Sequence, residues 1–240
     1  SHSPADLVLG LDMNLAAAAR ATGLLAPHQV DTSSLNLPGG WDDPVFVPFD
    51  YGYFAFVYDT EMLSEPPRSL QELVAADDNL KVIIQDPRTS TPGLGLMLWM
   101  KSVYGDQAPA AWAELSDNIL ATTKDWSEAY FSLFMEGEAP MVLSYSTSPA
   151  YHMAMEASQQ YQAAAFAEGH YLQVEVAARL KDGPNPDLAE QFLNFMLSTE
   201  FQRAIPLTNV MYPVIDLGDE LPAEFGQLIQ PAKVLQLDHM

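Results

Sequence analysis

VFVPFDYGYFAFVY, at residues 45–58, is strongly β-prone, because aromatic and β-branched side chains fill most of its positions. Pro48 and Gly52 are its interruptions. A second stretch, YLQVEVAARL at residues 171–180, alternates apolar and polar side chains as a strand does. The chain has no obvious flexible linker, so two-domain architecture would depend on β-segments that cross between lobes. Residues 49–58 and 170–177 are the candidates for those crossings.

Strands and helices alternate along the rest of the chain. The pattern predicts strands at residues 5–11, 82–85 and 141–145, and helices at 14–25, 69–76, 92–104, 109–115, 125–137 and 186–204. Ser69 with Glu72 and Asp125 with Glu128 have the spacing of a capping box. Thr91 fits a helix N-cap and Pro92 the first helical turn. This alternation predicts an α/β fold with largely parallel sheets.

Composition limits the classes of function and of site that this chain can have. The chain has 240 residues, 10 Lys and Arg, 32 Asp and Glu, and a net charge of −22. Such a charge repels phosphate backbones and anionic lipid, which argues against nucleic-acid binding and membrane-surface binding. It is compatible with a cationic ligand, and equally with a role in solubility. Cysteine is absent, which excludes disulfides, thiolate zinc sites and cysteine nucleophiles.

The sequence favours a binding protein over an enzyme. It contains no G-x-S-x-G, no H-E-x-x-H and no Walker loop. A Ser–His–Asp set assembled in space stays open, but no motif indicates one.

Polar and aromatic residues gather near the ends of the expected strands. Asp12 and Asp50 are carboxylates at strand-associated positions, where each would balance a cation, accept from an amine, or cap a turn or helix. Ser90 and Thr91 precede a helix start, where free backbone N–H groups attract anions and hydroxyls. Plain N-capping by Thr91 is the simpler alternative.

Aromatic residues form the second group of candidates. Trp126 follows an expected N-cap directly, which would place it at an edge of its lobe. Tyr145 and Tyr151 flank a Ser-Thr-Ser-Pro turn after a strand. Aromatic faces suit a cationic ring, with about 0.5–2 kcal/mol for each cation–π contact. Ordinary core or surface packing would explain the same residues.

Several segments closely resemble the bacterial periplasmic thiamine-binding proteins, which belong to the type II class of solute-binding proteins. The similarity extends from about residue 5 to residue 231. It is carried by DLVLGLD at residues 6–12, WDD at 41–43, VPFDYGYFAFVYD at 47–59, QDPRTSTPGLG at 85–95, WSEAY at 126–130, LSYSTSPAYH at 143–152 and EGHYLQVEVAAR at 168–179.

The resemblance implies a fold, a ligand and a set of partners. The fold is α/β with two lobes, residues 1–50 with 168–240 forming lobe 1 and residues 51–167 forming lobe 2. The ligand is thiamine, thiamine monophosphate or thiamine diphosphate, held in the cleft between the lobes without a cofactor. The partner is the membrane permease of an ABC importer, and the location is the periplasm. The implied contacts are Ser90 and Thr91 to the hydroxyethyl or phosphate arm, together with Trp126, Tyr145, Ser146, Thr147, Ser148 and a second stacking ring, Tyr151.

The resemblance also identifies differences. Family members carry a strand, a helix and a second strand before the point where this sequence begins, and a helix beyond Leu237. We therefore expect an incomplete lobe 1, weaker binding than in the relatives, and self-association. Relatives also read Asn-Trp-Met-Tyr-Pro-Val where this chain has Val at position 210. If that Trp lines the pocket, Val210 removes one aromatic wall.

A solute-binding protein of the same class with another ligand is the alternative. Iron, a polyamine and a phosphonate are the candidates. Iron binders of this class use an adjacent pair of tyrosines, whereas Tyr145 and Tyr151 are six residues apart.

Overall fold

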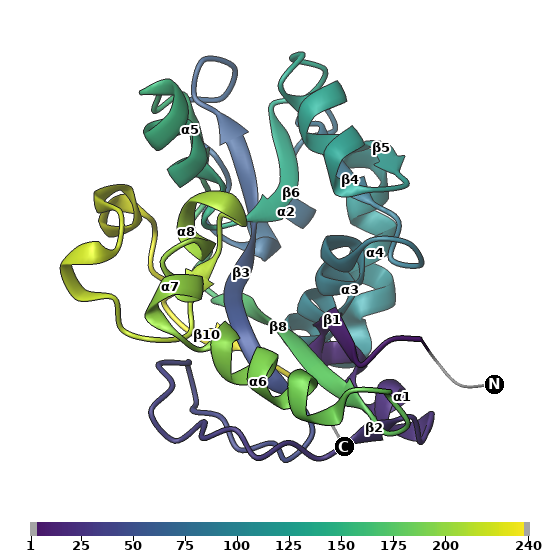
Figure 1. Ribbon diagram of the computed structural model, residues 1–240. Helices are drawn as coiled ribbons and strands as arrows, with labels where there is room; N and C mark the ends of the chain where they lie inside the picture. The colour runs from purple at the N-terminus through teal and green to yellow at the C-terminus, as the bar shows by residue number, and fades with distance from the viewer. Residues whose placement is uncertain (1–3, 238–240) are drawn as a thin grey trace. The chain divides into compact units, whose positions relative to one another are not determined.

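The computed structural model describes residues 4–237, which divide into two compact units. Unit 1 contains residues 4–52 and 173–222, and unit 2 contains Tyr53–Leu172 and Ala223–Leu237. The chain passes between the units inside two long strands, β3 (Val47–Asp59) and β8 (His170–Leu180), and once more after Pro222 (Figure 1). These strands are the two β-rich stretches of the sequence. Within residues 4–237, no helix is long and apolar enough to cross a membrane.

Unit 2 is built on a mixed sheet in which β6 (Met141–Tyr145), β4 (Val82–Gln85) and β5 (Ile119–Thr123) are parallel neighbours and β3 is antiparallel to β6. β7 (Tyr161–Ala163) also pairs with β3, and β10 (Val234–Leu235) pairs in parallel with the start of β8. The remaining elements of the unit are α2 (Leu70–Val74), α3 (Thr91–Tyr104), η2 (Gly105–Gln107), α4 (Ala108–Leu115), η3 (Ser116–Asn118), η4 (Glu128–Phe134), α5 (Ser148–Glu156) and η6 (Ala223–Gln227).

Side chains of alternate residues in β6 enter two different cores, as the two-residue period of a strand requires. Met141 and Leu143 pack into a core with α3 residues such as Trp99. Val142 packs into a second core with Tyr130 of η4. α3 approaches the sheet closely at Gly95, where a Cβ atom would collide with the Phe54 ring. The two faces of the sheet therefore carry different helices that start at the same edge.

Unit 1 is organised around the second half of β8. β1 and β2 pair with it antiparallel, and the first half of β3 pairs antiparallel with β9. The elements are β1 (Leu7–Asp12), η1 (Met13–Leu15), α1 (Ala16–Ala21), β2 (Leu25–Ala26), α6 (Pro186–Met196), α7 (Thr199–Gln202), α8 (Ile205–Thr208), β9 (Tyr212–Pro213) and η5 (Gly218–Glu220). Buried Gln202 joins them: its amide donates to the carbonyls of Phe49 and Met196, both at 2.8 Å, and accepts from the Val214 N–H at 2.7 Å.

Two sequence-based expectations about the fold are wrong. The sheets are mixed rather than largely parallel, because β1, β2, β7 and β9 all pair antiparallel. The helix expected over residues 186–204 stops at Met196, since Ser198 takes an extended conformation and its hydroxyl caps α7 instead. The division of the chain into functional lobes stays a prediction. Of the two compact units, residues 223–237 belong to unit 2, where β10 pairs with β8 at His170 and Tyr171.

Candidate ligand-binding site

Three neighbouring parallel strands of unit 2 end at one edge of its sheet, and each is followed by candidate ligand residues. Ser90 and Thr91 follow β4, Trp126 follows β5, and residues 145–148 end β6 and follow it. The strand ends are in register, since Gln85 of β4 lies opposite Thr123 of β5. In open α/β sheets this carboxyl edge is where ligands bind. The fold thus brings together eight of the ten candidates from three distant parts of the sequence, with Tyr151 following on α5.

α3 begins one residue earlier than the sequence suggested. Ser90 is the N-cap, with an extended backbone, and Thr91 is already the first helical residue. The expectation that Thr91 caps the helix is therefore wrong. The Ser90 side chain makes no capping hydrogen bond, although its carbonyl accepts from the Leu94 N–H at 3.1 Å. Its hydroxyl therefore does not occupy the N–H groups of the first turn, which remain suited to an anionic oxygen.

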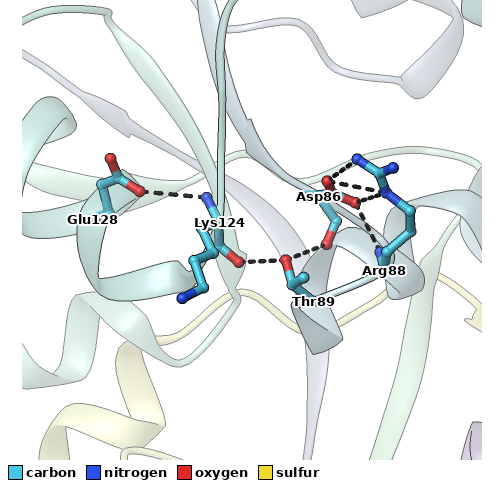
Figure 2. Close-up of polar contacts among 5 residues, drawn as sticks. All are labelled: Asp86, Arg88, Thr89, Lys124 and Glu128. Atoms are coloured by element: carbon cyan, nitrogen blue, oxygen red, sulfur yellow. Dashed lines mark hydrogen bonds and ion pairs between the residues drawn. The ribbon is translucent and has the colours of Figure 1, made fainter.

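The loops after β4 and β5 are tied to each other. Figure 2 shows the Thr89 hydroxyl donating to the Lys124 carbonyl at 2.6 Å. In the same view the Arg88 guanidinium pairs with the Asp86 carboxylate at 2.5 Å, and the Lys124 N–H donates to Glu128 at 3.3 Å. Hydrogen bonds from Arg88 lower the pKa of Asp86 to about 2. Arg88 is thus paired with a carboxylate of its own loop.

The Trp126 indole is held on three sides by unit 2. Its ring stacks on Tyr130 with centroids 4.9 Å apart and meets the edge of Phe131 at 5.3 Å. Its Nε1–H donates to the Ser144 hydroxyl at 2.8 Å. η4, which carries both neighbouring rings, is a π-helix, a form common at functional sites. The half-buried indole is therefore an oriented aromatic surface rather than a freely rotating side chain.

The turn between β6 and α5 supplies hydroxyl groups. Ser146 and Thr147 are fully buried, and among the described residues neither side-chain oxygen has a hydrogen-bond partner. A buried hydroxyl without a partner costs about 1–3 kcal/mol, which a bound polar ligand would offset. Ser148 is the first residue of α5, and its hydroxyl bonds to Ser144 at 2.8 Å. The half-buried Tyr145 ring lies 5.2 Å from Phe54.

Tyr151 is also half-buried, on the first turns of α5. Its ring meets the edge of His152 at a centroid distance of 5.4 Å. Its place on the helix that starts at Ser148 is compatible with the stacking role that the resemblance implies.

Asp12 and Asp50 belong to unit 1, whereas the other eight candidates belong to unit 2. Asp12 ends β1 opposite Glu175 of β8. Asp50 lies in β3, the next strand after β8 in the sheet, and it shares the Asn209 amide with Glu175. These carboxylates, which we call the acidic row, thus lie across three adjacent strands. No ion pair among residues 4–237 involves any member of the row.

Burial shapes the chemistry of the acidic row. Asp12 is 4% exposed and Asp50 is 0% exposed, and each has one buried oxygen without a partner in the described structure. Desolvation raises the pKa of Asp12 to about 6, against hydrogen bonds from Asn14 that lower it. Desolvation and repulsion from Glu175 raise the pKa of Asp50 well above its ordinary value. Asp12 also caps η1 through the Asn14 N–H, so the capping role is confirmed, whereas its role toward a cation stays a prediction.

Two residues of this region were missed in the sequence. Glu175 is a charged residue between the buried apolar neighbours Val174 and Val176 of β8, and that contrast was the available signal. Ser144 gave no signal, because a serine inside a strand is common and its partner Trp126 is 18 residues away. No group of three or more His, Asp or Glu among residues 4–237 is arranged to hold a metal ion.

Comparison with known proteins identifies the family. Residues 2–214 match the family model described as bacterial extracellular solute-binding protein. The thiamine-binding periplasmic protein of Escherichia coli is 58% identical over 98% of this chain and 71% of its own length. This chain belongs to the bacterial extracellular solute-binding proteins. The protein of the same name from Salmonella typhimurium is 57% identical over the same shares of the two chains.

Solved structures agree with this assignment. A periplasmic thiamin binding protein superposes with a TM-score of 0.94 at 58% identity, covering 98% of this chain and 73% of that chain. Iron-bound HitA from Pseudomonas aeruginosa superposes with a TM-score of 0.75 at 22% identity, covering 90% of this chain and 72% of its own, which shows the fold alone. The expected fold class, α/β of the type II periplasmic-binding kind, is confirmed, and the family is one of binding proteins rather than enzymes.

Proposed function

We propose that this chain binds thiamine and its phosphates in the periplasm and delivers them to the membrane permease of an ABC importer. The observation that carries the proposal is its 58% identity, over nearly the whole chain, to a thiamine-binding periplasmic protein. Trp126 and the hydroxyl groups of unit 2, gathered at one sheet edge, supply the chemistry that such a ligand needs.

Each part of thiamine has a counterpart in unit 2. Trp126 offers an oriented aromatic surface for a cationic or heteroaromatic ring. Tyr151 is the second stacking ring in the proposal. Ser146 and Thr147 carry buried hydroxyls that a polar ligand atom would satisfy. The start of α3 at Ser90 and Thr91 suits the hydroxyethyl arm or a phosphate, because N–H groups and the helix dipole attract negative oxygen.

The acidic row supplies carboxyl groups in unit 1, whereas the candidates in unit 2 supply aromatic rings, hydroxyls and N–H groups. Asp12, Asp50 and Glu175 form a patch of carboxylates without a positive partner among the described ion pairs. In the proposal this charge favours the thiazolium cation over neutral analogues. Selectivity for a cation is then supported by the whole row rather than by Asp12 or Asp50 alone.

A same-class binding protein for iron, a polyamine or a phosphonate is the alternative. Iron-bound HitA shares only the fold with this chain. The acidic row would suit a polyamine, and the α3 terminus would suit a phosphonate. A phosphonate would not use the oriented Trp126 indole, and a polyamine would not use the α3 terminus, so thiamine explains more of the site.

Isothermal titration calorimetry of this chain tests the proposal. Thiamine, thiamine monophosphate and thiamine diphosphate should each give saturable binding with one site per chain. Spermidine, ferric citrate and a small alkylphosphonate serve as the competing ligands. Binding of one of these with no thiamine signal would replace the proposal with the alternative, and saturation by neither group would reject both.

We also propose that copies of this chain associate with one another. β1 lies at the end of the strand order and pairs only with β8 among the described strands, while its Leu9 is 52% exposed. A free apolar strand edge promotes pairing between chains. Because a net charge of −22 opposes association, added salt should promote it. Light scattering at low and high salt tests this, and a monomer under both conditions would contradict it.

A further inference from the structure

Two sets of hydrogen bonds in the interior of unit 2 support the Trp126 indole. In the first, its Nε1–H donates to the Ser144 hydroxyl at 2.8 Å, and Ser144 bonds to the Ser148 hydroxyl at 2.8 Å. The second set holds Tyr130, the ring on which the indole stacks. The Tyr130 phenol bonds to Nε2 of His152 at 2.9 Å, and Nδ1 of His152 bonds to Glu156 at 2.8 Å.

The direction of the bond between Trp126 and Ser144 follows from the chemistry of the indole. An indole N–H can only donate, so the Ser144 oxygen accepts from Trp126. Alanine at position 144 would leave this N–H without its acceptor.

Most of the side chains in these hydrogen bonds are buried, so disturbing their arrangement is costly. Ser144 and His152 are 0% exposed, and Tyr130 is 2% exposed. Burial raises the pKa of Tyr130, so the phenol keeps the proton that it donates. Buried networks with every member satisfied are rigid and specify one arrangement. Glu156, with a side chain 38% exposed, connects this network to solvent.

We infer that Ser144, held by its hydrogen bond to Ser148, is a positioning residue that fixes the Trp126 indole for ligand stacking, and that Tyr130, held by His152 and Glu156, supports the same ring. The inference rests on the proposed function for its effect on affinity, but the hydrogen bonds themselves are independent of the ligand. Tyr130 contributes by stacking under the indole at 4.9 Å, in a position fixed by its bond to His152. Without Ser144, the indole keeps its stacking partner and loses the bond that sets its rotation.

A double-mutant cycle with thiamine as the probe tests the inference. Ser144→Ala should weaken thiamine binding about fivefold, as expected from the loss of one hydrogen bond at about 1 kcal/mol. In a Trp126→Phe background, which has no indole N–H, the same change should leave the dissociation constant unchanged. Equal weakening in both backgrounds would show that Ser144 acts on general structure, and would overturn the inference. Ser102→Ala, which removes a hydroxyl bonded to the Trp99 carbonyl, is the matched control and should leave binding unchanged.

The indole N–H resonance provides a readout that does not need the ligand. The chain has 4 Trp residues, and Trp126→Phe identifies the signal of interest in a spectrum of protein labelled with ¹⁵N at tryptophan. Ser144→Ala should shift that resonance and speed its exchange with solvent, while the other three signals stay in place. An unshifted resonance would overturn the inference. A shifted resonance in a protein that binds no thiamine would support the network and reject the proposed function.

Variants at Glu156 test the support of Tyr130. Glu156→Gln keeps an oxygen that accepts from His152 and should leave the Trp126 resonance in place. Glu156→Ala removes the acceptor and should shift that resonance through the stacked Tyr130 ring. If both variants leave the resonance unchanged, or both shift it equally, the part of the inference that concerns Tyr130 is overturned.

Discussion

Replacing Asp12 with asparagine should stabilise the folded protein at neutral pH and change its stability little at pH 4. The rise in the pKa of Asp12 from 3.8 to about 6 corresponds to about 3 kcal/mol. The folded protein favours the protonated carboxyl, so the wild type has its full relative stability below about pH 4. That stability is lost as the pH rises through about 6, where the folded protein must hold a buried charge.

Asparagine fits the Asp12 site well. The carboxylate oxygen Oδ1 accepts from the Asn14 N–H at 3.0 Å and from the Asn14 amide at 2.9 Å, and an amide oxygen accepts both bonds equally. The amide nitrogen would replace Oδ2, which is buried without a partner in the described structure, and it would act as a donor opposite Glu175. We therefore expect Asp12→Asn to gain about 2 kcal/mol at pH 8, somewhat below the full electrostatic term.

Urea unfolding followed by circular dichroism between pH 4 and pH 8 measures this gain. Asp31→Asn is the matched control, because Asp31 accepts from the Ser33 N–H in the same local pattern but is exposed, with a lowered pKa. Its substitution should reduce stability at pH 8, with the opposite sign. A gain for Asp12→Asn that is equal at pH 4 and pH 8, or a loss at pH 8, would refute the electrostatic reasoning. Thiamine titration of the same variant shows whether the stability gain is accompanied by weaker binding, as expected if the charge serves the ligand.

Other substitutions test the remaining candidates. Trp126→Ala should weaken thiamine binding by about 1–2 kcal/mol by calorimetry, and an unchanged dissociation constant would remove Trp126 from the site. Ser90→Asp should weaken thiamine monophosphate more than thiamine because only the phosphate is repelled, so equal losses would argue against a phosphate at α3. Val210→Trp should tighten thiamine binding by restoring an aromatic wall, and no change would show that position 210 is remote from the ligand. Val210→Asn should raise the unfolding free energy by about 1 kcal/mol, since φ is +54° at this β-branched residue and Asn tolerates that region better; lower stability would contradict the assignment of strain.

The parts of the fold that were predictable from sequence have local signals. The limits of β4 and β6 and the end of α3 agree with the sequence reading, because apolar runs there are bounded by Pro, Gly and Asp. The capping role of Ser69 is confirmed by its bond from the Glu72 N–H at 2.8 Å. In contrast, β5 is partly polar and exposed, and its strand form depends on pairing with β4. The two-residue strands β9 and β10 likewise exist only through their partners.

The candidate site also has a part that was predictable from local sequence and a part that depends on contacts between distant residues. Residue types at strand ends were enough to select Trp126 and the 145–148 segment, and the sheet register then gathered them at one edge. Their ligand roles stay predictions. Hydrogen bonds between distant residues were not predictable: the Ser144 bond to Trp126 depends on β6 and the loop after β5 lying at one face. The acidic row needed the β1–β8–β3 strand order, which no local pattern specifies.

The acidic row separates two explanations of the negative charge. Most of the 32 acidic residues are described adequately by a role in solubility, because exposed carboxylates cost little. Asp12 and Asp50 are different, since they are buried, close to a third carboxylate, and without a cation in the described ion pairs. Asparagine or a protonated analogue would cap η1 and bond to Asn209 equally well, so structure alone does not require carboxylates there. The proposed cationic ligand would give the carboxylates a role, because its positive charge offsets the repulsion among them. The stability that unit 1 gives up at neutral pH is then the expected counterpart of the proposed selectivity for a cation.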